Sequence, residues 1–458
     1  MRYSYLLILI FLSAWITLGF RLSQLESPTF DEPVHLNAGA LYEKGDYDFD
    51  PIEPPLLRRV VYKVGSQSGQ YRLVIISLTG LFLSVLIWHL IKTSFLSGFL
   101  ASFLFLTEAN LVAHCHYVTT DAVSAIVSVI ASLMILSFTP LVITAVFIAI
   151  SASTKVATIA LLGPLLLIKA RKIGTKQLLF IFIIAFIFIW ATYGFRWQPI
   201  LNDLPLSFPF GGYLRAIKEN ILFAQRGQPI FFQGQVFLQA PISKTPLTIL
   251  LKISLPLLIL AVWATITQRR QTATFRLIFF IAVVVNLFKP LNFGIRHLLS
   301  AEIALVLVAS RCKPKTIASW GIILFLLVWQ AAGFIKSLPQ PITFANELAG
   351  DKPYQIFTDS DYDWGQGLIQ LNKEIDKKGI KSFQFAYFGN IDPKEYLPVF
   401  TRVKDENPVG SLPIQPIDYE ETIIISVTCY YQCGYYQDPN LKYKKSSLIA
   451  KSFLLFND

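Results

Sequence analysis

Apolar residues gather in long runs along the first 336 positions, and short polar turns separate these runs. The first run, YSYLLILIFLSAWITLGF, has about the length that a helix needs to cross a bilayer. No small-x-small cleavage pattern follows it, so we interpret it as a retained anchor and not as a signal peptide. Further apolar runs cover roughly residues 72–92, 95–110, 119–138, 140–153, 156–169, 178–195, 247–267, 275–290, 296–310 and 316–336. The pattern predicts an α-helical polytopic membrane protein with about eleven membrane segments.

Three of these runs, at 95–110, 140–153 and 156–169, are short for crossing a bilayer. They predict helices that are tilted, re-entrant or buried within the bundle.

The composition agrees with a multi-pass membrane protein. Of the 458 residues, 54% are hydrophobic and only 15% are charged, and the mean hydropathy is +0.53. The net charge of +11 could indicate a nucleic-acid partner. However, the Lys and Arg residues form short clusters between apolar runs and not one basic face, so no nucleic acid is expected.

Those basic clusters predict the topology. One arrangement, in which no run is skipped, places all of them on the cytoplasmic side: Arg2, Lys92, KARKIGTK, QRRQTATFR and RCKPK. Three polar regions then face the exoplasmic side of the cell membrane: the acidic stretch at 21–71, the loop at 196–246 and everything after about residue 337.

The polar tail is predicted to be a small exoplasmic α/β domain. The segments YQIFTDS and KSFQFAYFG have the pattern of strands, and they lie on either side of a helical GLIQLNKEIDKK. A further strand is predicted at ETIIISVTC.

Carboxylates occur at the start of two predicted helices on the exoplasmic face. Pro33 fits the first turn of a short helix, so Asp31 and Glu32 precede it, and Asp121 heads a long apolar run. Helix capping is the structural interpretation of these acids. The functional interpretation is a site at the bilayer edge, where two carboxylates act as base and orienting acid or hold a divalent cation. Asp31, Glu32 and His35 are the candidate metal ligands, although their spacing does not require a metal.

Basic residues gather on the same predicted face. They are Arg58 and Arg59 after EPPLL, Lys155 in a turn, Lys244 in APISKTPLTILL, and Arg296 with His297 in NFGIRHLL. A single Lys or Arg at a helix end usually extends toward the bilayer surface without further function. Several on one face, opposite carboxylates, favour a site for a phosphate or pyrophosphate.

The same residues carry a family resemblance. An acidic DE pair after the first membrane helix is followed by PPL, AHxxxVTTD, KTPL, GIRHLL and a tail that reads FANELAG, DSDYDWGQGLIQL and YFG. In this order the chain resembles the phospholipid-carrier-dependent glycosyltransferases of the GT-C superfamily. The nearest branches are the protein O-mannosyltransferase-like enzymes and the transferase that adds aminoarabinose to lipid A. The resemblance runs from about residue 27 to about residue 396, and it depends on the order and spacing of motifs that are each short.

The resemblance implies a GT-C-like transmembrane catalytic domain at 1–336 and an exoplasmic domain at 337–458. Such an enzyme moves a sugar from a polyprenyl-phosphate donor to a protein or glycolipid acceptor, on the exoplasmic face and with inversion. The sugar and the acceptor stay open.

The resemblance also implies roles for individual residues. Asp31 would be the base that deprotonates the acceptor hydroxyl, with support from Glu32, and Asp121 would lie near the acceptor. Lys244 and Arg296 fall in motifs placed close to the donor phosphate.

One position departs from the family pattern. Relatives often carry a basic residue just before PPL, and this chain has Glu53 there. One phosphate contact is therefore in doubt, and Arg58 or Arg59 is expected to replace it. The chain shows no nucleotide-binding loop, which a lipid-linked donor would not need.

The tail motif DSDYDWGQGL also suggests calcium. Asp359, Asp361 and Asp363 alternate as in a calcium loop, but Trp364 stands where the sharp turn needs Gly, and Gln370 replaces the terminal Glu. A strand-to-helix turn fits better, with Trp364 packed against the membrane surface or the catalytic loops.

Two other functions stay open at this stage. A transporter or flippase of lipid-linked sugars would usually show paired repeats and interrupted helices, which we do not find in the sequence. A receptor would not need acids and bases on five loops that face one side. Separately, Cys429 and Cys433 could pair in an oxidising compartment.

Overall fold

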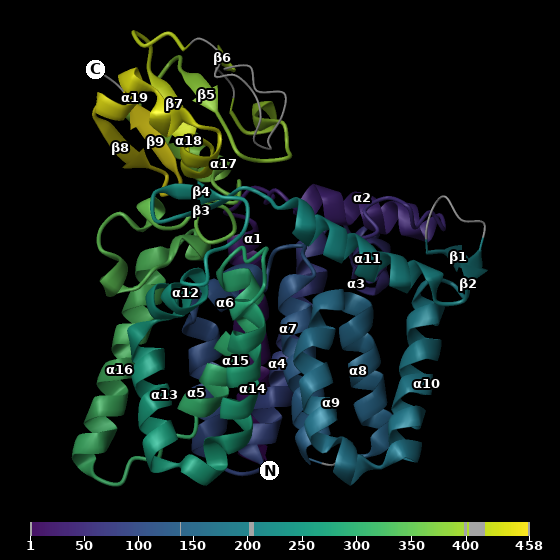
Figure 1. Ribbon diagram of the computed structural model, residues 1–458. Helices are drawn as coiled ribbons and strands as arrows, with labels where there is room; N and C mark the ends of the chain where they lie inside the picture. The colour runs from purple at the N-terminus through teal and green to yellow at the C-terminus, as the bar shows by residue number, and fades with distance from the viewer. Residues whose placement is uncertain (1, 138, 201–205, 398–400, 403–416, 457–458) are drawn as a thin grey trace.

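The computed structural model describes residues 2–137, 139–200, 206–397, 401–402 and 417–456, and it shows a helical bundle with a five-stranded sheet beyond one end (Figure 1). The bundle and its surface helices are α1 (Arg2–Ser23), α2 (Glu32–Glu43), α3 (Leu56–Gly65), α4 (Tyr71–Ile91), α5 (Phe95–Thr107), α6 (Ala109–His114), α7 (Asp121–Ser137), α8 (Leu141–Thr154), α9 (Ile159–Ile173), α10 (Thr175–Thr192), α11 (Gly211–Arg226), α12 (Lys244–Lys252), α13 (Leu255–Thr267), α14 (Arg269–Leu287), α15 (Ile295–Ala309) and α16 (Ile317–Ser337). The tail adds α17 (Leu368–Lys378), α18 (Val427–Gln432) and α19 (Pro439–Tyr443). Strands are β1 (Gln198–Pro199), β2 (Ser207–Phe208), β3 (Ile230–Phe232), β4 (Gln235–Phe237), β5 (Gln384–Ala386), β6 (Thr401–Arg402), β7 (Ile423–Ser426), β8 (Ser446–Ile449) and β9 (Phe453–Phe456).

Five helices are long and apolar enough to cross a membrane: α1, α4, α10, α14 and α16. The pair α12 and α13 passes the same test together, but it is bent by 102°, as in a broken span or a re-entrant loop. Within the described residues the count is therefore five, or six with the bent pair, and it falls short of the predicted eleven. The chain thus has the helices of a multi-pass membrane protein, as its composition predicts.

The shortfall has a physical reason. The apolar helices α5, α7, α8 and α9 have 13 to 17 residues, so at about 1.5 Å per residue they do not reach across a hydrocarbon layer of about 30 Å. The sequence had already shown that the runs at 95–110, 140–153 and 156–169 are short.

Two of the shorter helices lie at the centre of the bundle. In α7, 14 of 17 residues are buried, and in α15, 12 of 15 are buried. Helices that are apolar all round need such an interior place. Because α7 begins at Asp121 and Arg296 is the second residue of α15, both side chains are mounted on the first turn of a tightly packed helix.

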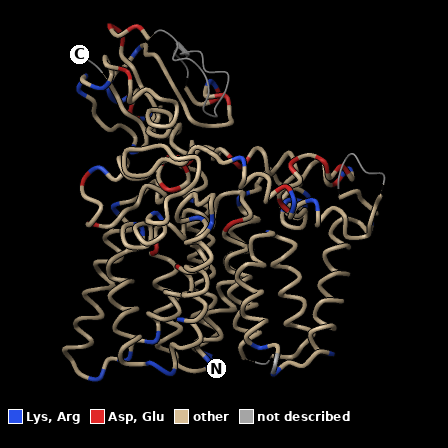
Figure 2. The backbone as a smooth tube through the Cα atoms, viewed as in Figure 1, with Lys and Arg blue, Asp and Glu red and all other residues tan. Residues whose placement is uncertain are grey.

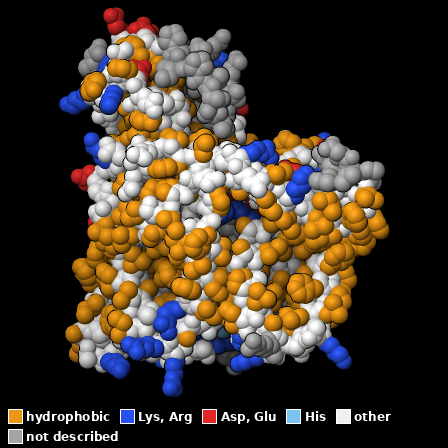
Figure 3. All heavy atoms as spheres, viewed as in Figure 1, with side chains coloured by type: hydrophobic (Ala, Val, Ile, Leu, Met, Phe, Trp, Pro, Cys, Tyr) orange, Lys and Arg blue, Asp and Glu red, His pale blue; other side chains and the backbone are white. Residues whose placement is uncertain are grey.

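Charge divides the molecule along the bundle axis. Figure 2 shows Lys and Arg at the end of the bundle farthest from the sheet, and most Asp and Glu toward the sheet end. Between the two ends the visible side of the bundle is covered largely by hydrophobic side chains (Figure 3). The helices α2 and α11 lie across the sheet end, roughly perpendicular to the long helices (Figure 1).

The tail holds a mixed sheet with the strand order β6-β5-β7-β9-β8. Strand β5 pairs in parallel with β6 and β7, whereas β9 pairs antiparallel with β7 and β8. The helix α17 packs its buried Leu368, Leu371 and Ile375 into a core with residues of these strands. The predictions of this helix and of strands at KSFQFAYFG and ETIIISVTC are confirmed.

The predicted strand at YQIFTDS is wrong. Pro353–Gln355 form a 3₁₀ turn, and Asp359 has a φ of +55°, which a strand does not allow. Asp359 and Asp363 instead face each other across a tight turn. The predicted boundary at 336/337 lies at the end of α16, and the division into two domains stays a prediction.

Candidate active site

A cavity of about 420 Å³ lies at the sheet end of the bundle, where the N-terminal turns of α7 and α15 meet the tail. Its charged walls contain Asp31, Asp50, Glu53, Asp121 and Asp359 as acids, and Arg58, Lys155, Lys289 and Arg296 as bases, together with His35 and His297. The cavity therefore brings together seven of the predicted residues: Asp31, His35, Arg58, Asp121, Lys155, Arg296 and His297.

Asp31 and Arg296 form the central pair. Arg296 Nη1 donates a hydrogen bond of 2.8 Å to Asp31 Oδ2. The guanidinium also lies over two aromatic rings, with its carbon 4.6 Å from the centroid of Phe293 and 4.8 Å from that of Trp364. Asp31 precedes α2 but makes no side-chain capping bond, so the capping interpretation does not account for its carboxylate.

A second ionic group lies beside the first. Lys155 Nζ donates a 2.5 Å hydrogen bond to Asp121 Oδ1 and lies 3.6 Å from Glu53 Oε1. The other oxygen of Glu53 is buried without a hydrogen-bond partner among the described residues. Burial raises the pKa of Glu53, and the nearby cations Lys155 and Arg58 offset only part of that increase. The carboxyl group of Glu53 thus contacts one of the site's own cations.

Arg58 is held between three neighbours. Its Nε donates to His35 Nδ1 over 2.8 Å, and its other nitrogens donate to Asp50 Oδ2 at 2.8 Å and to the Tyr42 hydroxyl at 3.1 Å. Burial, followed by the charge of Arg58, holds the pKa of His35 well below its usual value. The His35 ring is therefore neutral at pH 7, with Nδ1 as an acceptor and Nε2 as a donor.

Three predicted residues lie outside the cavity walls. Arg59 bonds to Glu43, Tyr47 and the backbone of Thr192. Lys244 is buried and donates to Asp361 Oδ2 over 3.3 Å.

Glu32 is the third of them, and it accepts five hydrogen bonds. Arg72 Nη2 and Nε donate at 2.6 and 2.8 Å, and the amides of Thr29 and Val118 donate at 2.8 and 3.1 Å, with the Thr29 hydroxyl at 3.1 Å. Burial alone would raise the pKa of Glu32, but Arg72 and the amides outweigh it, so the pKa is lowered. Glu32 fixes the loop that carries Asp31.

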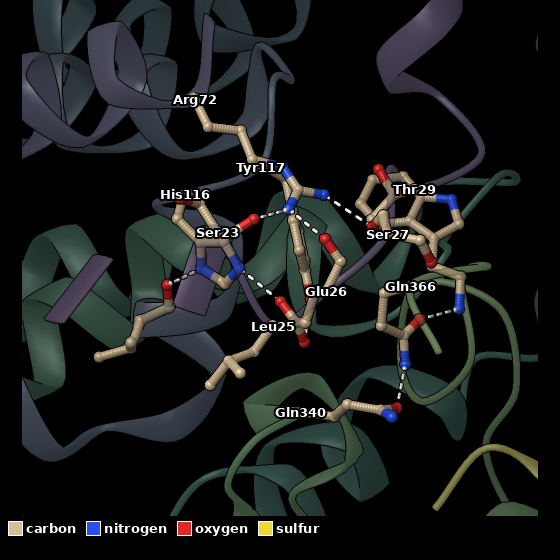
Figure 4. Close-up of polar contacts among 12 residues, drawn as sticks. Ser23, Leu25, Glu26, Ser27, Thr29, Arg72, His116, Tyr117, Gln340 and Gln366 are labelled. Carbon is tan, nitrogen blue, oxygen red and sulfur yellow. Dashed lines mark hydrogen bonds and ion pairs between the residues drawn. The ribbon is translucent and has the colours of Figure 1, made fainter. Parts of the chain in front are cut away.

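Figure 4 shows the rest of that anchorage. Arg72 also donates to the carbonyl oxygens of Ser23, Glu26 and Ser27, at 2.8 to 3.2 Å. The Glu26 carboxylate in turn contacts His116 Nε2 at 2.5 Å and the Tyr117 hydroxyl at 3.2 Å. The chain between α1 and α2 is therefore tied to the segment just before α7.

Four charged residues of the cavity walls were not among the predicted site residues: Asp50, Glu53, Lys289 and Asp359. Lys289, in the loop after α14, lines the cavity, and burial followed by the charge of Lys155 lowers its pKa to about 7. Asp359 reaches the cavity from the tail, and burial raises its pKa to about 6 despite the charge of Arg296. The nearness of Lys289 to the GIRH motif was the signal available for it, and Asp359 was considered only for calcium.

Neither set of residues considered as metal ligands is assembled. Among the described residues, no group of three or more His, Cys, Asp or Glu side chains is placed to hold a metal ion. Glu32 is bound to Arg72, and His35 Nδ1 is bound to Arg58. In the tail, Cys429 and Cys433 form no disulfide; they lie in one helical turn, where the Cys433 amide donates to the Cys429 carbonyl oxygen.

Two further cavities adjoin the bundle. One of about 300 Å³ shares Asp121, Lys155, Lys289, Arg296 and His297 with the first, and it continues between α7, α9, α14 and α15. Another of about 790 Å³ has almost entirely apolar walls and lies between α8, α9 and α10 beneath α11. Figure 3 shows Lys or Arg atoms inside a hollow of the bundle that hydrophobic side chains surround.

No family model, curated protein or solved structure matches the chain. The chemistry of the site follows from its own groups. A carboxylate beside a guanidinium can accept a proton, and several fixed cations can stabilise negative charge that develops on a bound group.

Proposed function

We propose that the protein is a membrane glycosyltransferase that moves a sugar from a polyprenyl-phosphate donor to a hydroxyl of a protein or glycolipid. The observation that carries this proposal is the cavity itself, where carboxylates and four Lys or Arg side chains converge at one end of an apolar bundle. A lipid-linked anion needs such a place, because its chain stays in the bilayer while its phosphate reaches fixed cations. In the proposed orientation this end of the bundle faces the exoplasmic side.

The proposed reaction is one displacement at the sugar's C1. The acceptor oxygen forms a bond to C1 while the C1–O bond to phosphate breaks, and the phosphate oxygen keeps the electron pair. Asp31 takes the acceptor's proton, so the products are the glycosylated acceptor and polyprenyl phosphate. Attack opposite the leaving phosphate inverts the configuration at C1.

Arg296 links the two halves of this reaction. It bonds to Asp31 through Nη1, and its planar guanidinium can offer further N–H groups to a phosphate. Lys155 and Lys289 line both the site cavity and the adjoining 300 Å³ cavity. In the proposal these three cations hold the phosphate as its charge grows, and Asp121 keeps Lys155 in place.

The same geometry revises one role that the resemblance implied. Lys244 points to Asp361 and does not line the cavity, so the proposal gives its phosphate contact to Lys289. Arg58 lines the cavity and can reach the donor or the acceptor, whereas Arg59 does not line it.

Turnover tests the proposal directly. The purified protein in lipid nanodiscs should convert a radiolabelled polyprenyl-phosphate sugar to polyprenyl phosphate when a membrane extract supplies the acceptor. A flippase, the alternative function, would instead move the labelled lipid across a liposome bilayer and leave its C1–O bond intact. Transbilayer movement without any release of polyprenyl phosphate would replace the enzyme with that alternative.

A further inference from the structure

The tail segment DSDYDWGQ turns its three aspartates toward three different parts of the molecule. Asp359 lines the site cavity. Asp363 is buried in the tail, where its Oδ2 accepts a 2.8 Å hydrogen bond from the amide of Thr428. Asp361, between them, is fully buried and points into the bundle. An alternating acidic motif that resembles a calcium loop therefore connects three structures and does not converge on one ion.

Asp361 binds the first turn of α15. Its Oδ1 accepts a 2.6 Å hydrogen bond from the amide of Ile295, the residue just before Arg296. Gly294 precedes it with a φ of +92°, and a Cβ there would overlap the Asp361 carboxylate. Only glycine allows this approach, because a side chain would have to occupy the space of the carboxylate. Lys244 Nζ at 3.3 Å supplies the opposite charge from α12.

The backbone of the same segment holds the other side of the site. The Phe30 amide donates to the carbonyl oxygen of Trp364 over 2.8 Å, and Phe30 is the neighbour of Asp31. The Ser27 amide donates to the carbonyl oxygen of Gln366 over 3.0 Å. Gln366 itself is fixed, since its side chain accepts from the Trp364 amide and donates to Gln340 (Figure 4).

These contacts reach the immediate neighbours of the two paired residues. Residue 30 is held by Trp364 and residue 295 by Asp361, and the Trp364 ring lies 4.8 Å from the guanidinium carbon of Arg296. Simple packing of a tail on a bundle would not need bonds at both of these positions. Residues 361–366 thus contact the chain next to Asp31 and the chain next to Arg296.

We propose that residues 361–366 of the tail are the positioning element of the site, and that Asp361 is the positioning residue that fixes Arg296 against Asp31. The catalytic part of this inference rests on the proposed function. The structural part, which is the position of Arg296 relative to Asp31, does not. The tail then acts as part of the reaction centre and not as an accessory domain.

The structural consequence is tested without activity. Hydrogen–deuterium exchange of the full-length protein in detergent should show exchange of the peptide around residues 293–297 faster by roughly fivefold in Asp361→Ala, because one amide hydrogen bond is lost. Asp361→Asn keeps an acceptor for the Ile295 amide and should exchange nearly as the wild type does. Asp376→Asn, an exposed aspartate on α17, is the matched control. Unchanged exchange in a folded Asp361→Ala protein would overturn the proposal.

A second variant controls for the charge of Lys244. Removing Asp361 leaves Lys244 buried without its partner, which alone can unfold the protein. The double variant Asp361→Ala with Lys244→Met removes both charges, so it should fold and still show the faster exchange at 293–297. A double variant with wild-type exchange would mean that the Asp361 carboxylate does not hold α15.

The catalytic consequence is tested with a double-mutant cycle. The double variant Asp361→Ala with Lys244→Met should lower kcat with a polyprenyl-phosphate sugar by roughly tenfold or more, with a smaller change in donor KM, whereas Asp361→Asn should keep kcat near the wild-type value. In an Arg296→Gln background the same double change should have almost no further effect, because its target is gone. Additive effects would overturn the positioning role. One outcome separates the two proposals. If neither the wild type nor any variant turns over the donor, but exchange at 293–297 responds as described, the proposed function fails and the positioning of α15 stands.

Discussion

Arg296 Nη1 lies 2.8 Å from Asp31 Oδ2, although 265 positions of the chain separate the two residues. One comes from the loop after the first helix and the other from the first turn of the buried helix α15. The ion pair keeps a carboxylate oxygen and a guanidinium in adjacent positions, and these are the proposed base and the proposed phosphate-binding group. An acceptor hydroxyl and a donor phosphate can therefore engage the two side chains at the same time, and this supports the proposed transfer.

The first prediction concerns the base. Asp31→Asn keeps the size of the side chain but cannot take a proton at neutral pH, so transfer should fall by roughly 10²-fold or more. Initial rates with purified protein in nanodiscs measure this loss. Asp46→Asn changes an exposed acid in the same acidic stretch and should leave the rate unchanged. A near-normal rate in Asp31→Asn would remove Asp31 as the base.

The second prediction concerns the leaving group. Arg296→Gln removes charge stabilisation that grows as the phosphate departs. With saturating donor, kcat should therefore fall, and the activation free energy should rise by about 2–4 kcal/mol. Lys92→Gln, just after the end of α4, is the control and should cost almost nothing. Equal rates in both variants would show that Arg296 serves only Asp31 or the fold.

The third prediction concerns orientation. The basic turns lie at the end of the bundle away from the sheet (Figure 2), so the acidic stretch at 21–71 and the tail should share the exoplasmic side. Asp46→Cys and Asp376→Cys should react in intact cells with a thiol reagent that does not cross membranes, whereas Lys172→Cys should react only after lysis. Labelling of Lys172→Cys alone in intact cells would invert the topology and move the site to the cytoplasm.

The helices were the more predictable part of the fold, because a bilayer requires long apolar runs and such runs are visible in the sequence. The number of these helices that cross the membrane was not predictable. Whether a run crosses depends on bends such as the one of 102° between α12 and α13, and tertiary packing sets these. The strand predicted at YQIFTDS failed for a related reason, since the turn at Asp359 is held by a long-range hydrogen bond from its amide to the Thr428 hydroxyl.

The site was predictable as a set of charges on one face, but not as a geometry. Lys244 and Lys289 both follow or precede apolar runs, so sequence alone does not rank them. The structure turns Lys244 to the buried Asp361, which lies 117 positions away, and leaves Lys289 on the cavity wall. Such a choice depends on a long-range contact that no local pattern encodes.

The fourth prediction concerns stability. Glu32→Gln leaves the largely buried Arg72 without its charged partner, so the free energy of unfolding should fall by about 3–5 kcal/mol. Glu43→Gln breaks the more exposed pair with Arg59 and should cost at most about 1 kcal/mol. Denaturant unfolding in detergent compares the two. Equal losses would mean that Glu32 does not anchor the Asp31 loop.

The fifth prediction uses the pKa of Lys289, which burial lowers to about 7. A sugar–phosphate–lipid donor is a phosphodiester and keeps one negative charge between pH 6 and pH 8. Lys289 is charged below its pKa and neutral above it, so its attraction for the phosphate is present at pH 6 and largely lost at pH 8. Donor KM should therefore rise between these pH values, by up to roughly tenfold if Lys289 contacts the phosphate directly.

Lys289→Arg separates this lysine from the other titrating groups of the cavity. Arginine stays charged throughout the range, so donor KM in this variant should stay nearly constant from pH 6 to pH 8. Asp359, whose pKa is about 6, becomes negative over the same interval and would weaken donor binding in both proteins. Any change of donor KM with pH that remains in Lys289→Arg is therefore due to Asp359 and the other titrating groups. An unaltered pH profile in Lys289→Arg would remove Lys289 from the phosphate site and return that role to Arg58 and Lys155.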